Sequence, residues 1–257
     1  MDLWQIIKQN PNYHEINREE RNYTAILYTA LCHPDNALKF LREVCEKEID
    51  TLGPDFGIYF EYSFLRDLWF IINNDEIKKN VIRQLLPINK IDEILQKPIV
   101  EINHKFGTSG CSPNQVETPG NWAITKLSKH FSDNADFLKI CKFKWSFNIK
   151  PDLVIHLDKK MAICIEAKYE SNEGKYPSSS KEIKIFKERG IEAVGQIELQ
   201  KYMMEELLRI KTDCVFIVYK KVNSGDYKVT TWKEVLGSLD LSYLPNYAVK
   251  MVNNLRN

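Results

Sequence analysis

The spacing of apolar residues predicts helices in the first hundred positions. Tyr23, Ile26, Leu27, Ala30 and Leu31 recur at intervals of three and four residues, which places them on one face of a helix. Similar patterns predict a helix after Pro34 with Asp35 as its cap, a helix over 60–72, and a helix over 75–86 capped by Asp75. We therefore expect residues 1–100 to form an α-helical N-terminal region.

Beyond residue 100 the pattern indicates a mixture of strands and helices. A stretch rich in Gly, Ser and Pro over 107–120 leads into a helix predicted around 122–130, and good helix formers predict a second helix over 192–210. Short apolar segments predict strands at 138–147, 151–157, 161–167, 214–219 and 227–232. The strands at 151–157 and 161–167 are joined by a three-residue polar turn, so they predict a hairpin. Its second strand is wholly apolar up to Glu166 and is expected to be buried.

Composition narrows the class of protein without revealing its activity. The chain has 257 residues, of which 44% are hydrophobic, the profile of a packed globular protein. No apolar run approaches the roughly 20 residues that cross a bilayer, and the first ten residues do not resemble a signal peptide, so we expect a cytoplasmic protein without a membrane partner. The six cysteines include no CxxC pair and the five histidines are scattered, so we expect no zinc site.

Charge is balanced overall but not locally. The formal net charge is +1, whereas residues 139–190 carry 12 basic and 7 acidic side chains. Such an excess is compatible with a solvated loop and equally with a surface that faces phosphates.

Three ionisable residues stand at one end of the predicted hairpin. Asp152 begins its first strand, while Glu166 and Lys168 end its second, two positions apart and so on the same face. Charges at the end of a buried hairpin require mutual pairing or a metal ion to offset their desolvation. Two carboxylates with no nearby His or Cys suit a hard cation such as Mg²⁺ or Mn²⁺.

These residues resemble a known signature. Pro151-Asp152, thirteen intervening residues and then Glu166-Ala167-Lys168 are similar to the motif of the PD-(D/E)XK nuclease superfamily. The predicted order helix, strand, hairpin, helix, strand over about 118–220 also resembles its core. The resemblance implies an α/β fold with a restriction-endonuclease-like core, a central mixed sheet flanked by helices, in a nuclease domain over 101–257.

The resemblance also implies a chemistry. Asp152 and Glu166, with the Ala167 carbonyl, would hold Mg²⁺ or Mn²⁺, and Lys168 would orient the attacking water or neutralise developing charge. The implied activity is a metal-dependent DNA endonuclease, in restriction or antiviral defence, with RNA left open as substrate. The N-terminal helices would support a homodimer or a larger complex. The alternatives are an inactive nuclease-like module that binds nucleic acid or protein, and a structural ion pair in an unrelated hairpin.

Two further residues enter through the resemblance. Glu117 precedes the helix predicted around 122–130, where many members of the superfamily carry another acid, although an acid there is also an ordinary helix cap. Gln196 lies in the helix after the hairpin, where several branches carry a site glutamine, although a solvated helix surface explains it equally well. The motif itself is common, since [DE]xK occurs six times in the chain, and Pro54-Asp55 repeats the Pro-Asp pair in a segment predicted to be helical.

Overall fold

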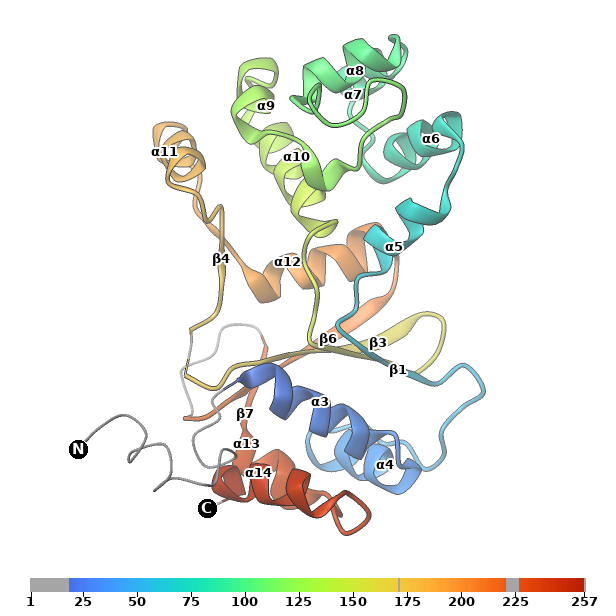
Figure 1. Ribbon diagram of the computed structural model, residues 1–257, viewed down its shortest axis with the longest axis vertical. Coiled ribbons are helices and arrows are strands. Elements are labelled where there is room, and N and C mark those ends of the chain that lie inside the picture. Colours follow the sequence, from blue (N-terminus) through green and yellow to red (C-terminus); the bar gives the residue numbers. More distant parts are fainter. Residues whose placement is uncertain (1–18, 171, 221–226, 257) are drawn as a thin grey trace, which may run out of the picture. The chain divides into compact units, whose positions relative to one another are not determined.

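A five-stranded mixed sheet lies at the centre of the first of two compact units in the computed structural model, which describes residues 19–170, 172–220 and 227–256 (Figure 1). The strand order is β1–β2–β3–β6–β7. The strands are β1 (Gly57–Phe60), β2 (Leu153–His156), β3 (Met161–Ala167), β6 (Lys211–Val218) and β7 (Lys228–Thr231). β1, β2 and β3 are antiparallel neighbours, whereas β3, β6 and β7 run parallel to one another. The predicted hairpin is confirmed as β2 and β3.

Helices of the same unit cover one face of this sheet. They are α3 (Glu20–Leu31), α4 (Pro34–Glu43), α13 (Trp232–Ser238) and α14 (Asn246–Arg256), and Figure 1 shows them on the same side of the strands. Alternate strand residues point toward them, including Leu153, Ile155, Ile163, Ile165, Val215 and Ile217, which share one buried cluster with Leu27, Phe40 and Trp232. Burial of this apolar face holds the strand ends in fixed positions.

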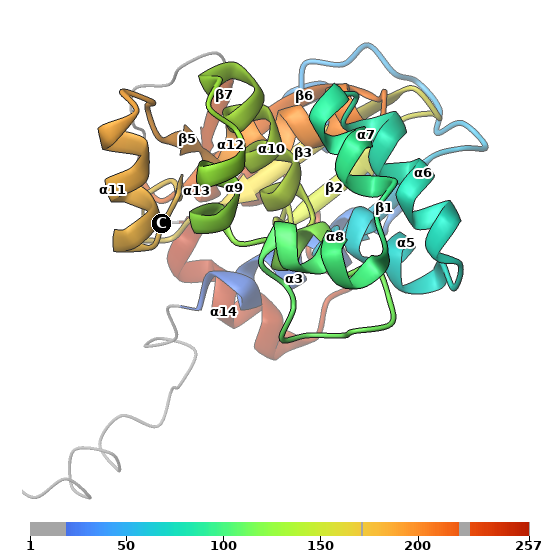
Figure 2. The same ribbon diagram turned by 90° about the horizontal axis from the view of Figure 1, so that it is seen from above.

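The second unit is helical and is built from residues 63–150 and 173–209. Its helices are α5 (Phe64–Ile71), α6 (Asp75–Leu85), α7 (Asn89–Leu95), α8 (Ile99–Phe106), α9 (Ile124–His130), α10 (Asn134–Ser146), α11 (Ser180–Glu188) and α12 (Gln196–Tyr202), with a 3₁₀ turn at Pro119–Asn121 and a π turn at Met203–Leu207. β4 (Lys175–Tyr176) and β5 (Val194–Gly195) form a two-stranded sheet. Figure 2 shows α6, α7 and α8 grouped together. None of the helices in the described ranges combines the length and apolar character needed to cross a bilayer.

The units divide the chain differently from the expectation. The first unit combines the described residues within 19–62, 151–172 and 210–256, so the expected boundary at residue 100 coincides with neither unit. The first hundred residues are not wholly helical either, because 57–60 form β1 and pair with β2. The helix predicted over 60–72 accordingly begins only at Phe64. Cross-strand pairing, which the local pattern does not contain, decides the structure here.

The strand predicted over 138–147 is wrong, because this segment belongs to helix α10. Asp133 caps the helix, accepting a hydrogen bond from the Asp136 N–H at 2.8 Å. Phe137, Ile140, Phe143 and Trp145 are all buried. They do not share one narrow face, so the 3.6-residue periodicity that identifies a surface helix is lost.

Helix boundaries were predicted less well than helix positions. The helix predicted over 75–86 is α6, but its cap is Asn74, whose side chain accepts from the N–H groups of Glu76 and Ile77. The helix after Pro34 has His33 at the cap position and not Asp35. The helix predicted over 192–210 begins only at Gln196, since β5 precedes it, and passes into the π turn.

Candidate active site at the end of the hairpin

The hairpin brings Asp152 and Glu166 to the same end of the sheet. Leu153 pairs with Ile165, and extending this antiparallel register by one residue sets Asp152 opposite Glu166. The Asp152 Oδ2 atom accepts a hydrogen bond from the Ala167 N–H at 2.8 Å. The side chain of Glu166 is only 2% exposed. The register therefore places Asp152 and Glu166 side by side at the end of the hairpin opposite its turn.

Lys168 lies between the carboxylate of Glu166 and a third acid. Its Nζ is 2.6 Å from Glu166 Oε1 and 3.1 Å from Glu20 Oε1. The other oxygen of Glu20 accepts a hydrogen bond from the Tyr169 N–H at 3.3 Å. Glu20 is the first residue of α3, so this helix, which covers the sheet, supplies a carboxylate to the same cluster.

Both the N–H and the carbonyl of Lys168 form hydrogen bonds. The Lys168 N–H donates to the Ile217 carbonyl at 2.7 Å, and its carbonyl accepts from Trp232 Nε1 at 3.1 Å. Because a trans peptide points its N–H and C=O in opposite directions, the Ala167 carbonyl faces away from β6. It therefore faces the side on which the Ala167 N–H meets Asp152. That orientation is the one a carbonyl ligand beside Asp152 would need.

Burial affects the pKa values of the acid Asp152 and the base Lys168 differently. Burial raises the pKa of Asp152 to about 6, and the Ala167 N–H and Lys168 oppose the increase only in part. For Lys168, burial acts to lower the pKa, but the attraction of Glu166, supported by Glu20 and Asp152, is stronger and raises it. Lys168 is therefore a fixed positive charge at neutral pH, whereas Asp152 carries its charge at a cost.

Two carboxylates and a backbone carbonyl are oxygen donors of the kind that hard divalent cations prefer. Among the described residues no group of three or more His, Cys, Asp or Glu side chains is arranged to hold a metal ion, so an ion here would have at most two carboxylate ligands. Mg²⁺ commonly binds one or two carboxylates and keeps several waters. Asp152 Oδ1 accepts no hydrogen bond from any described residue. Three carboxylates around one ammonium also leave a formal charge of −2, which a divalent ion would neutralise.

The two residues added through the resemblance lie in the second unit and have partners there. Glu117 accepts a hydrogen bond from the Asn121 side chain at 3.2 Å, and its N–H donates to Asn103. Gln196 is bonded to Gly174 through both its backbone N–H and its side-chain oxygen, at 2.8 and 3.3 Å. These contacts give both residues structural roles within their own unit.

Glu20 was missed because its helix was assigned to a separate N-terminal region. The local signal was present, since Glu19 and Glu20 directly precede the apolar helical pattern that begins at Tyr23. An acid in a first helical turn is usually explained by the helix dipole. Only the packing of α3 against the sheet distinguishes Glu20 from an ordinary capping acid.

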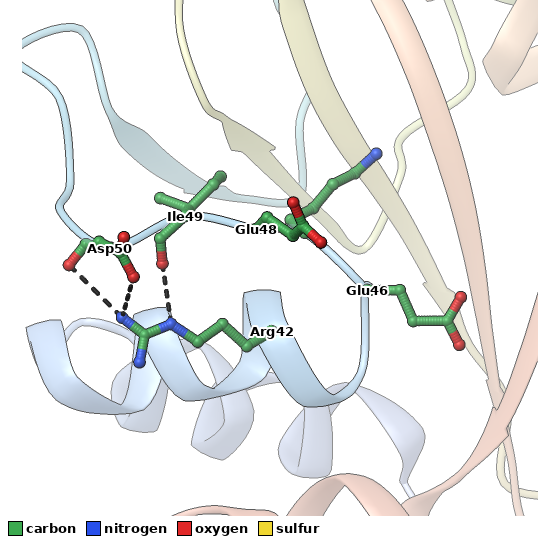
Figure 3. Close-up of a pocket in the computed structure, with 6 residues that line it drawn as sticks. Arg42, Glu46, Glu48, Ile49 and Asp50 are labelled. Carbon is green, nitrogen blue, oxygen red and sulfur yellow. Dashed lines mark hydrogen bonds and ion pairs between the residues drawn. The ribbon is translucent and has the colours of Figure 1, made fainter.

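A cavity of about 460 Å³ lies elsewhere in the first unit, at the loop that follows α4 (Figure 3). Its lining residues are Arg42, Glu46, Lys47, Glu48, Ile49 and Asp50, and none of the predicted site residues is among them. Arg42 Nε donates to the Ile49 carbonyl at 2.8 Å, while Lys47 and Glu46 form ion pairs with Asp213 and Lys228. These interactions fasten the loop to β6 and β7.

No family model, curated protein or solved structure matches this chain. The function is therefore argued from the geometry of the cluster formed by Asp152, Glu166, Lys168 and Glu20.

Proposed function

We propose that this protein is a metal-dependent deoxyribonuclease that hydrolyses phosphodiester bonds as an endonuclease. The observation that carries the proposal is the convergence of Asp152, Glu166 and Lys168 at the end of one hairpin. A structural ion pair needs one acid and one base, whereas this cluster contains an excess of buried carboxylate. A desolvated carboxylate oxygen that accepts no hydrogen bond from the described residues, such as Asp152 Oδ1, is costly to a fold, which favours a role as a ligand.

The topology supports a restriction-endonuclease-like core. A helix, α3, precedes an antiparallel meander of β1, β2 and β3, and the next long strand, β6, pairs parallel with β3. The helical segments of the second unit are inserted between β1 and β2 and between β3 and β6. This arrangement brings the nuclease-like strands together although they are distant in the sequence.

In the proposed mechanism Asp152, Glu166 and the Ala167 carbonyl hold Mg²⁺ or Mn²⁺. When bound, such an ion lowers the pKa of a coordinated water and stabilises negative charge on the phosphate. Hydrolysis forms a bond between the water oxygen and phosphorus, breaks the bond from phosphorus to the leaving sugar oxygen, and transfers a proton from the water to that oxygen.

Lys168 acts through its charge. Because its pKa is raised, it stays protonated at neutral pH and cannot serve as the base that deprotonates water. It donates hydrogen bonds instead, to the attacking water or to a phosphate oxygen as charge develops. Glu20 is a positioning residue, because its carboxylate contacts Lys168 Nζ and the Tyr169 N–H and so fixes where the ammonium points.

A plasmid-nicking assay tests the proposal. Supercoiled DNA is incubated with the protein in Mg²⁺, with EDTA as the metal-free control, and wild type is compared with Asp152→Ala, Glu166→Ala and Lys168→Ala. One active centre cuts one strand, so nicked circles are expected to form first, while direct linearisation would indicate a dimer. Each substitution is expected to lower the rate at least a hundredfold.

Two matched substitutions control for general damage. Asp55→Ala alters another Pro-Asp pair of the same unit, at a half-exposed side chain. Lys184→Ala alters the lysine of another [DE]xK tripeptide, at an exposed side chain. Both are expected to cut DNA at the wild-type rate. Equal nicking by all three site variants would contradict the proposal. DNA binding without nicking by the wild type would favour the alternative, an inactive nuclease-like binding module.

A further inference from the structure

We propose that Tyr219 and Tyr169 form a stacking platform that binds an unstacked base of single-stranded DNA beside Lys168. The inference deepens the proposed function and rests on it, because it specifies the substrate form that the same site accepts. It depends on four aromatic side chains of the first unit.

The four side chains form a continuous column from the core to the surface. Trp232 and Tyr23 are buried, with ring centroids 6.1 Å apart. Tyr23 stacks on Tyr169 at 5.5 Å with 29° between the ring planes, and Tyr169 contacts Tyr219 at 5.2 Å. Tyr219 ends the column at the surface, with 45% of its area exposed.

The column is adjacent to the proposed catalytic group. Tyr169 follows Lys168 directly in the chain, and its N–H is bonded to Glu20, which also contacts Lys168 Nζ. Lys168 Nζ and the Tyr169 N–H thus contact the two oxygens of one carboxylate. This shared anchor is the reason to place the base of a nucleotide on the platform when its phosphate lies at Lys168.

The platform is rigid. Tyr219 follows the last residue of β6, and Val215 and Ile217, at alternate positions before it, are buried in the core. Trp232 holds the Lys168 carbonyl at 3.1 Å, directly before Tyr169. Because these side chains are already ordered, little conformational entropy is lost when a ring is placed on them.

The platform presents an aromatic face, which suits a neutral base better than a second phosphate. The charged residues that follow the two tyrosines in the chain, Glu170 and Lys220, are exposed. Stacking on an aromatic side chain tolerates every base, because each has a π face. Bases inside a duplex already stack on their neighbours, so only a single strand, an end or an extruded base offers a free face.

Fluorescence anisotropy with labelled oligonucleotides tests the platform. The protein carries Asp152→Asn, so that DNA is bound without being cut, and the probes are a 12-nucleotide single strand and the matching blunt duplex, both in Mg²⁺. Adding Tyr219→Ala is expected to raise the Kd for the single strand about 5- to 150-fold, the range seen when one stacking aromatic is removed. The Kd for the duplex is expected to change less than twofold.

Matched variants separate stacking from other effects. Tyr219→Phe and Tyr219→Trp keep a ring and are expected to bind the single strand within about threefold of the parent, which also shows that the fold tolerates substitution at this position. Tyr247→Ala removes a tyrosine that is 68% exposed in α14 and is expected to have no effect. The inference is overturned if the parent does not bind the single strand, if Tyr219→Ala binds it as well as the parent, or if Tyr219→Phe loses as much as Tyr219→Ala.

The two proposals fail in different ways. If the wild type binds single strands through Tyr219 but never nicks DNA, the platform stands and the nuclease does not. If the wild type nicks DNA in a way that requires Asp152, but Tyr219→Ala cuts single strands and duplexes at unchanged rates, the nuclease stands and the platform does not.

Discussion

Replacing Asp152 with Asn is expected to stabilise the metal-free protein while removing its response to metal. Burial raises the pKa of Asp152 from 3.8 to about 6, so the folded state disfavours the charged form. One pKa unit corresponds to about 1.4 kcal/mol, and the full difference to about 3 kcal/mol. Asn has a similar shape, its amide oxygen can accept the hydrogen bond from the Ala167 N–H, and it cannot ionise.

The sign of the pH dependence follows from linkage. Below pH 3.8 Asp152 is protonated in both the folded and the unfolded state, so its ionisation costs nothing. Between about pH 4 and 6 the unfolded state releases its proton first, and the stability of the wild type falls. Above about pH 6 the cost is complete. Asp152→Asn is therefore expected to exceed the wild type in free energy of unfolding by up to about 3 kcal/mol at pH 7.5, and the difference should shrink toward zero as the pH approaches 4.

Urea unfolding followed by tryptophan fluorescence measures this difference. The titrations are run in EDTA at several pH values and repeated at pH 7.5 with Mg²⁺. A ligand that binds only the folded state raises its stability, so Mg²⁺ should stabilise the wild type and leave Asp152→Asn unchanged. Asp55→Asn, the control at another Pro-Asp pair, is expected to stay within about 0.5 kcal/mol of the wild type throughout. An Asp152→Asn protein that is less stable than the wild type at pH 7.5, or whose gain does not vary with pH, would refute the reasoning.

Three further predictions concern the cluster and its supports. Lys168→Met should lower the free energy of unfolding by about 3–5 kcal/mol, because it leaves the buried carboxylate of Glu166 without its ammonium partner; urea unfolding at pH 7.5 checks this, and a loss below 1 kcal/mol would contradict it. Glu20→Gln should reduce kcat in the nicking assay about tenfold with little change in KM, because Lys168 loses a charged contact that orients it; an unchanged kcat would remove Glu20 from the site. Thr231→Ala should cost about 1 kcal/mol of stability, since Thr231 and Glu234 form a capping box at the start of α13; nicking by this variant should match the wild type at temperatures where both are folded.

The cluster at the hairpin could be predicted from the sequence, because its residues lie close together in the chain. Asp152 and Glu166 lie on two strands joined by a short turn, and the alternation of side chains along a strand sets which residues share a face. Once the hairpin was identified, the approach of the two carboxylates followed. Lys168 followed with them, two positions after Glu166.

Glu20 and the aromatic column could not be predicted from the sequence, because their contacts join segments that are far apart in the chain. Glu20 is separated from Lys168 by 148 positions in the chain, and Tyr23, Tyr169 and Tyr219 come from three distant segments. Their contacts depend on how α3 packs on the sheet and on the parallel pairing of β3 with β6. Neither leaves a periodicity in the sequence, because the pairing partner of a parallel strand is not its neighbour along the chain.

The assignment of elements to the two units was also beyond what local sequence patterns can predict. Local patterns identified β3, α6 and the hairpin, because capping residues, polar turns and apolar runs act over a few residues. They misassigned α10, whose burial on several sides hides its period, and they missed β1 in a region expected to be helical. By itself the sequence determined which short segments are apolar, where chains turn and which charges share a strand face. Only the tertiary structure decided that β1 and α3 join the hairpin, because the free energy that selects such contacts comes from burying surfaces that lie far apart in the chain.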